Sequence, residues 1–221
     1  MLNITHPYPY KEFKRKSVNG KRLYENPYGD PVPSVTTILS KTKDMTHLNA
    51  WKKRVGEVKA QEIVTEAAGV GTVMHEILEA WSLNKEYTGT TMLQAKMMAE
   101  TVIKNVESDI NEVWGSEVNL CYPGLYAGTT DLVGVYKGNP CIMDFKQTNK
   151  PKKREWIEDY FMQAAAYAMA HNETFETKIE HAAIFMCSRD LDWQLFEVGP
   201  DEFAGWEVKW ANKVSEFYNL T

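Results

Sequence analysis

Residues 126–147 have the sequence YAGTTDLVGVYKGNPCIMDFKQ and contain the most informative pattern in the chain. Two segments with strand-like composition, 126–136 and 140–147, flank the compact turn sequence KGN, which predicts a β-hairpin. Asp131 lies in the first segment. Asp144 and Lys146 lie in the second, where the two-residue period of a strand puts them on one face. Because Asp and Lys are disfavoured in strands, this set requires an explanation other than folding.

A divalent metal site would explain it. Two converging carboxylates, Asp131 and Asp144, form a hard oxygen site suited to Mg²⁺ or Mn²⁺. Such an ion would hold a phosphate and lower the pKa of a bound water. Lys146 could position that water or offset developing negative charge. The alternative, for so short a pattern, is a buried Asp–Lys ion pair or strand ends that face solvent.

The segments before the hairpin are mostly helical. Residues 21–32 predict a loop or short hairpin, and Ser34 is a suitable N-cap for a helix that follows it. Helical periodicity predicts further helices over about 46–67, from Gly71 to about Trp81, and over about 91–114, with Gly69 and Gly71 as an interruption. A strand is expected over 117–123.

The segments after the hairpin alternate between helix and strand. We expect a helix over 154–171, strands over 177–187 and 192–198, and an amphipathic helix from about 201. The sum is an α+β fold in which a small mixed sheet is flanked by helices. One domain is expected over residues 1–221, with a helical part at 34–114 and the sheet with its flanking helices at 115–221.

Three of these segments carry a resemblance when taken together. GTTDLVG (128–134), CIMDFKQ (141–147) and QAAAYA (163–168) resemble, in order and spacing, the RecB-like branch of the PD-(D/E)XK nuclease superfamily. PSVT (33–36) and the helices after it look further like the mitochondrial genome maintenance exonuclease family and its phage relatives. The resemblance covers residues 24–218, and it implies a restriction-endonuclease-like core with a helical N-terminal elaboration.

The resemblance also implies roles for individual residues. The implied catalytic set is Asp131, Asp144, Lys146, Gln163 and Tyr167. The implied metal ligands are His75 of a G-x-x-x-H motif, Asp131, Asp144 and the carbonyl of Phe145. From its residues alone, His75 could equally be a helix residue packed near the sheet. Relatives commonly have Thr or Ser directly after the Lys, where this chain has Gln147. The difference could alter the contacts that support the metal ligands.

Other residues are weaker candidates. Glu117 could add a carboxylate near the site, whereas Glu79 is expected to face solvent. Tyr160 could stack on a base or belong to the core. Two basic clusters could contact phosphates or be solvated faces: residues 11–22, with six cations and one anion, and the group Lys150, Lys152, Lys153 and Arg154.

The function that the resemblance implies is Mg²⁺- or Mn²⁺-dependent hydrolysis of DNA. The expected substrate is a single strand with a free end, over which segment 34–114 would form an arch; the role would be recombination, repair or DNA degradation. A structure-specific endonuclease on the same fold is one alternative. A non-catalytic nucleic-acid-binding or recombination-partner protein is another. Protein partners leave no trace in the sequence.

Bulk properties set the remaining expectations. The net charge is −5, so a nucleic-acid surface would have to be local. No apolar run reaches the roughly 20 residues of a membrane helix, and no targeting segment is recognisable, which predicts a cytoplasmic protein, possibly encoded by a phage. Cys121, Cys141 and Cys187 form no CxxC pair, so we expect buried free thiols and no iron–sulfur cluster.

Overall fold

The computed structural model of the protein describes residues 1–18 and 21–220. Its main sheet has five strands in the order β4-β5-β6-β7-β8, all antiparallel except the parallel β6–β7 pair. The strands are β4 (Ile110–Tyr122), β5 (Tyr126–Tyr136), β6 (Asn139–Thr148), β7 (Ala182–Ser188) and β8 (Trp193–Val198). This mixed sheet, with helices around it, confirms the predicted α+β class.

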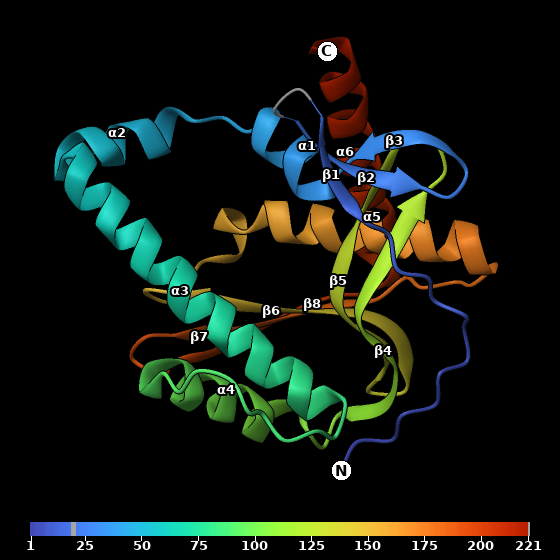
Figure 1. The fold of residues 1–221 in the computed structure, drawn as a ribbon, viewed down its shortest axis with the longest axis horizontal. Helices are drawn as coiled ribbons and strands as arrows, with labels where there is room; N and C mark the ends of the chain where they lie inside the picture. The colour runs from blue at the N-terminus through green and yellow to red at the C-terminus, as the bar shows by residue number, and fades with distance from the viewer. Residues whose placement is uncertain (19–20, 221) are drawn as a thin grey trace.

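Helices cover both faces of the main sheet (Figure 1). One face packs on α3 (Glu57–Ser82) and α4 (Leu93–Val106), and the other on α1 (Val35–Lys41), α5 (Glu158–Phe175) and α6 (Pro200–Leu220). Neighbouring residues of one strand contribute to opposite cores, because side chains alternate across a sheet. On β5, Leu132 packs with α3 and α4, whereas Val133 packs with α1, α5 and α6. The site described below lies between these two layers of helices.

A second, three-stranded antiparallel sheet stands at the N-terminal end of the chain. It consists of β1 (Arg15–Val18), β2 (Lys21–Asn26) and β3 (Gly29–Pro33). The predicted short hairpin over 21–32 is therefore confirmed, and β1 adds a third strand to it. Residues 19 and 20 of the predicted basic cluster 11–22 lie outside the described residues. Of the cluster's described side chains, Lys16 forms an ion pair with Glu25.

The helical part differs from the sequence expectation in where its helices break. α3 runs without interruption through Gly69 and Gly71, and the break falls at Gly56, between α2 (Thr46–Val55) and α3. A glycine inside a helix costs only about 1 kcal/mol, which the packing of a long helix can offset. Ser34 caps α1 as predicted, since its Oγ accepts a hydrogen bond from the Thr37 amide at 3.0 Å.

The predicted helix over 91–114 is too long. α4 ends at Val106, and β4 begins at Ile110, seven residues before the predicted strand. β4 has two register shifts against β5, between Ile110 and Glu112 and between Val113 and Gly115. Each shift adds a residue, so that Ile110 and Val113 are both buried at a spacing of three. That spacing imitates helical periodicity, which explains the wrong prediction.

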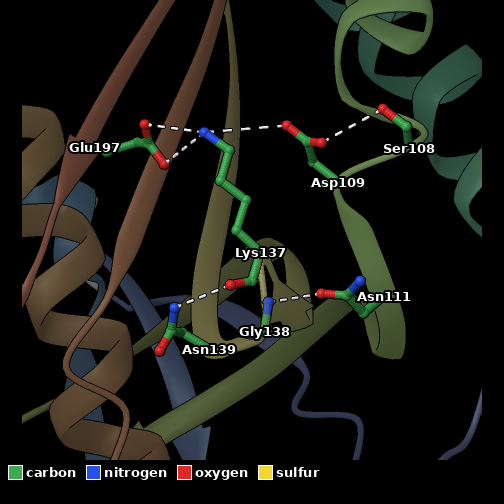
Figure 2. A network of polar contacts seen from close by, with 7 residues as sticks. All are labelled: Ser108, Asp109, Asn111, Lys137, Gly138, Asn139 and Glu197. Atoms are coloured by element: carbon green, nitrogen blue, oxygen red, sulfur yellow. Dashed lines mark hydrogen bonds and ion pairs between the residues drawn. The ribbon is translucent and has the colours of Figure 1, made fainter.

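The β5–β6 turn is a two-residue hairpin held by polar contacts. Lys137 and Gly138 both have positive φ, 48° and 80°, which is the backbone of a type I′ turn. The Lys137 ammonium contacts Glu197 on β8 at 3.0 Å and Asp109 at 4.0 Å, and the Gly138 amide donates to Asn111 at 2.7 Å (Figure 2). These contacts join the hairpin to the start of β4 and to β8.

The remaining helices and strands differ from the predicted ones only in where they begin or end. The helix predicted over 154–171 is a short 3₁₀ helix, η1 (Arg154–Trp156), followed by α5. The strand predicted over 177–187 is formed only from Ala182 onward. The three cysteines are buried and free, as expected.

Candidate active site

The site forms where β5 and β6 separate. Their pairing runs from Tyr136 and Asn139 to Leu132 and Met143 and then stops. Beyond that point the Asp131 side chain replaces the missing strand contact, because its Oδ2 accepts a hydrogen bond from the Phe145 amide at 2.7 Å. In Figure 1, β4 and β5 curve away from β6. At this point the Asp131 side chain is 13% exposed.

Asp144 and Lys146 lie together on one face of β6, as their spacing predicts. The Lys146 ammonium forms an ion pair with Oδ2 of Asp144, and that oxygen is buried. Burial raises the pKa of Asp144 to about 6, against the opposing effect of the Lys146 charge. The carboxylates of Asp144 and Asp131 raise the pKa of Lys146 in spite of its burial. Two acids therefore face one lysine in a nearly dry site.

His75 reaches this site from α3. Its Nδ1 lies 3.4 Å from Oδ1 of Asp131, and its ring stands edge-on to Phe145 with the centroids 6.3 Å apart. Burial disfavours the charged form of His75, but the charge of Asp131, its hydrogen bond to the ring and the charge of Asp144 together outweigh burial, and the pKa of His75 is raised. In return, His75 keeps the pKa of Asp131 low despite burial. The imidazole thus faces the carboxylates and does not merely pack beside the sheet.

Glu117 is the residue that the sequence suggested as an additional carboxylate near the site. β4 pairs Ser116 with Leu132 and Val118 with Thr130, which puts Glu117 across from Asp131. One ligand atom each of His75, Glu117 and Asp131 lies within 4.8 Å of the others. Glu117 has a positive φ of 50°, which a non-glycine residue adopts at a cost and which is enriched at functional sites. Burial and the charge of Asp131 raise its pKa to about 7.

Glu79 lies one turn after His75 on α3. It is half-buried, not fully exposed as the sequence suggested, and its charge contributes to the raised pKa of Glu117. It therefore lies near the acidic group, although it is outside the convergent set of His75, Glu117 and Asp131.

Gln163 and Tyr167 lie on α5 beside the same strands. Tyr167 is buried, and Nε2 of Gln163 donates a hydrogen bond to its hydroxyl at 3.3 Å. The Tyr167 ring fills the space of a missing side chain at Gly128 on β5: a Cβ there would come within 2.8 Å of the ring. These two residues therefore support the strand that carries Asp131.

Tyr160 and the predicted basic residues lie at the start of α5 and before it. The Lys146 ammonium lies 4.9 Å from the centroid of the Tyr160 ring. Arg154 forms an ion pair with Glu202 and donates to the Glu197 carbonyl at 3.1 Å, so its contacts are within the protein. Lys150 and Lys153 are exposed, whereas Lys152 is half-buried.

The donor atoms of this site fit a divalent cation. Carboxylate oxygens and one imidazole nitrogen converge from three elements. The carboxylates of Glu117 and Asp131 are close enough for the charge of Asp131 to raise the pKa of Glu117, and a bound cation would relieve that repulsion. Hard oxygen donors with one imidazole suit Mg²⁺ or Mn²⁺. A mixed sheet with two acids and a lysine where two strands part is also the arrangement that the resemblance to the PD-(D/E)XK superfamily implies.

The proteins to which the chain is similar in sequence are named as exonucleases. The chain is 28% identical over 172 residues to mitochondrial genome maintenance exonuclease 1 of Xenopus tropicalis, covering 72% of this chain and 49% of that protein. The Homo sapiens protein of the same name is 27% identical over 175 residues, covering 72% of this chain and 50% of its own length. The predicted resemblance to this nuclease group is confirmed. The chain spans about half the length of these relatives.

Other comparisons are less informative. No model of a known protein family matches the chain. A solved structure from Eubacterium rectale, described as a candidate exonuclease, has a TM-score of 0.44 at 14% identity and covers 66% of this chain and 63% of its own. That likeness is too distant to carry an argument. Along the described residues, no helix has both the length and the apolar character needed to cross a membrane.

Proposed function

We propose that this protein is a metal-dependent nuclease that hydrolyses phosphodiester bonds of single-stranded DNA from a free end. The observation that carries the proposal is the convergence of Asp131, Asp144 and Lys146 with His75 where β5 and β6 part. The names of its relatives, exonucleases of mitochondrial genome maintenance, support DNA as the substrate.

The residues that would hold the metal are His75, Glu117, Asp131, Asp144 and the carbonyl of Phe145. Bound Mg²⁺ or Mn²⁺ would supply charge to stabilise the pentacoordinate phosphate and would lower the pKa of a bound water. Asp131 is fixed for this task by the Phe145 amide on one oxygen and by His75 on the other. A carboxylate held at both oxygens loses little freedom on binding a cation, and this favours tight binding.

Lys146 would act on the reacting phosphate. Its ammonium lies between the Asp144 carboxylate and the Tyr160 ring, and both favour the charged form. From that position it can hold the attacking water and offset the negative charge that grows on the phosphate oxygens. Gln163 and Tyr167 would steady β5 and thereby the position of Asp131.

The preference for a free end rests on the helical arch predicted for segment 34–114. The linker after α1 is tied to the start of α5 by an ion pair between Lys43 and Asp159. α2 buries none of its residues, and α3 returns to the sheet, where an added Cβ at Gly71 would lie 3.9 Å from Gln147. The chain from 43 to 71 thus leaves the start of α5 and returns to the sheet at Gly71, which supports an arch under which a strand with an end would be threaded.

The test is cleavage of end-labelled linear single-stranded DNA in Mg²⁺ or Mn²⁺, with EDTA, Lys146→Ala and Lys137→Ala as controls. We expect metal-dependent digestion by the wild type and by Lys137→Ala, and none by Lys146→Ala. A circular single strand should survive, because it has no end. Cleavage of the circle would favour the structure-specific or other endonuclease. Binding without cleavage of any DNA or RNA strand would reject the nuclease in favour of a binding protein.

A further inference from the structure

Trp156 is exposed in a way that the fold does not require. It ends η1, immediately before α5, and 62% of its surface is accessible. None of the other six tryptophans, all of them within the described residues, is exposed. Indole is large and apolar, so a tryptophan left open on a surface commonly marks a contact site.

The segment that carries Trp156 is held in place. The Thr148 hydroxyl donates to the Lys150 carbonyl at 2.8 Å. Gln194 of β8 accepts from the Lys152 amide at 2.6 Å and donates to the Lys152 carbonyl at 2.8 Å. The Trp156 amide donates to the Lys153 carbonyl at 3.0 Å. The indole is therefore presented from a fixed backbone, which reduces the entropy lost when a ligand binds.

The charge around Trp156 is mixed: Lys153 is exposed, and so is Glu155, the residue next to Trp156. The Lys153 ammonium lies 5.4 Å from the centroid of the Trp156 ring, and neither Lys150 nor Lys153 forms an ion pair with any described residue. A second Lys–Trp pair on α6 makes the contrast clear. There, Lys209 lies 4.1 Å from the Trp206 ring but is neutralised by Glu158 at 3.2 Å.

The position of Trp156 connects it with the candidate active site. Tyr160, Gln163 and Tyr167 follow one another at spacings of three and four, which is one side of α5. Tyr160 contacts Lys146, and Trp156 precedes Tyr160 by four residues, in η1 just before the start of α5. The start of α5 faces the side of the molecule where α3 passes the sheet (Figure 1).

We propose that Trp156, with Lys153, forms a platform on which an unpaired base of a single-stranded nucleic acid stacks beside the nucleotides to be cleaved. The inference rests on the proposed function for its ligand. An open aromatic face with a free cation fits a strand whose bases are unstacked and whose phosphates are charged. A duplex would offer it only phosphates, because its base faces are covered by their neighbours.

The experiment measures binding in EDTA, where no cleavage occurs, by fluorescence anisotropy. The probes are a labelled single-stranded DNA, a strand of equal length made of abasic residues, and a duplex. The proteins are wild type, Trp156→Ala, Trp156→Phe and Val208→Ala, the last because Val208 is also 62% exposed but lies on α6. We expect Trp156→Ala to weaken binding of the base-bearing strand about tenfold, Trp156→Phe to restore part of it, and Val208→Ala to change nothing.

The abasic strand and the duplex decide the interpretation. Both should bind wild type and Trp156→Ala equally, because neither offers an open base. Equal weakening of all three ligands, or of none, would overturn the platform. Since the readout is binding without metal, the platform could fail while metal-dependent cleavage stands. Conversely, base-dependent binding without any cleavage would reject the nuclease and keep the platform.

Discussion

The β5–β6 hairpin carries two charged clusters that differ mainly in burial. At its turn, Lys137 contacts Glu197 and Asp109, and all three side chains are exposed by more than a third (Figure 2). Further along the same strands, Asp131, Asp144 and Lys146 are held between two layers of helices. Asp144 is only 3% exposed. Both clusters combine two carboxylates with one ammonium.

The difference shows why one cluster is a candidate site and the other is a surface contact. An exposed ion pair contributes little to stability and costs little to form. Buried carboxylates held close to one another are costly and persist where they serve a function. Accordingly, the pKa of Asp144 is raised to about 6 by burial, whereas that of Lys137 is raised mainly by its bond to Glu197. The following predictions test this contrast, from the largest effect to the smallest.

Asp144→Asn is expected to lower the rate of DNA hydrolysis by roughly 10³-fold. The substitution removes a carboxylate ligand from the metal, and several kcal/mol of transition-state stabilisation are lost with it. Asp109→Asn, in the exposed cluster, should leave the rate unchanged. Initial rates on a linear single strand measure both, and calorimetric titration with Mn²⁺ should show weaker binding to Asp144→Asn alone. Unchanged Mn²⁺ affinity in that variant would remove Asp144 from the metal site.

Gly128→Ala should destabilise the protein by about 1–3 kcal/mol, as overpacking does, because the added Cβ would lie 2.8 Å from the Tyr167 ring. At the turn, Gly138→Ala meets open space but has a φ of 80°, so its cost should be about 1 kcal/mol. Urea unfolding gives both values. Combining Gly128→Ala with Tyr167→Leu should recover stability if the Tyr167 contact is the cause, and no recovery would exclude it.

The pH dependence of stability should also separate the clusters. The pKa of Asp144 is about 6 in the folded protein and 3.8 ordinarily, so its contribution is complete below pH 3.8 and is lost as the pH rises through 6. Without metal, wild type should therefore lose stability relative to Asp144→Asn over this window, by on the order of 1 kcal/mol. For Lys137, also with a raised pKa, any loss falls above pH 10.5. Urea titrations across these pH values measure both, and a flat difference between pH 4 and 6 would contradict the shift.

The smallest effect is expected at the exposed cluster itself. Lys137→Ala should lower the free energy of unfolding by less than about 1 kcal/mol, and the loss should shrink further in 1 M salt. Urea unfolding at low and high salt tests this. A loss that is large and independent of salt would mean that the cluster of Figure 2 holds the hairpin by more than screened charge.

Sequence patterns predicted the hairpin well and the start of β4 badly, for one physical reason. Strands with regular alternation, such as β5 and β6, carry their period in the sequence. β4 contains two bulges, and the first of them, between Ile110 and Glu112, gives Ile110 and Val113 a helical spacing although they are extended. The break at Gly56 was missed for a related reason: the cost of Gly69 and Gly71 in a helix is small, and tertiary packing decides whether a helix continues.

The candidate site likewise has one part that local sequence predicts and another that only the tertiary structure brings together. Asp144 and Lys146 are two residues apart on one strand, so their meeting follows from local geometry. His75 was suggested by resemblance, and its contact with Asp131 depends on how α3 crosses the sheet. Glu117 meets Asp131 only through the register of β4 on β5, and the exposure of Trp156 in η1 depends on how the folded chain packs around it. No short sequence pattern encodes either fact.

The amino-acid sequence by itself determined the α+β class, the β5–β6 hairpin and the pairing of Asp144 with Lys146, because these depend on periodicity and on neighbours in the chain. The tertiary structure alone decided which charges are buried, which donors converge and which aromatic ring stays open. Burial and convergence are properties of surfaces that meet from distant parts of the chain, and they set the pKa values on which the proposed chemistry depends.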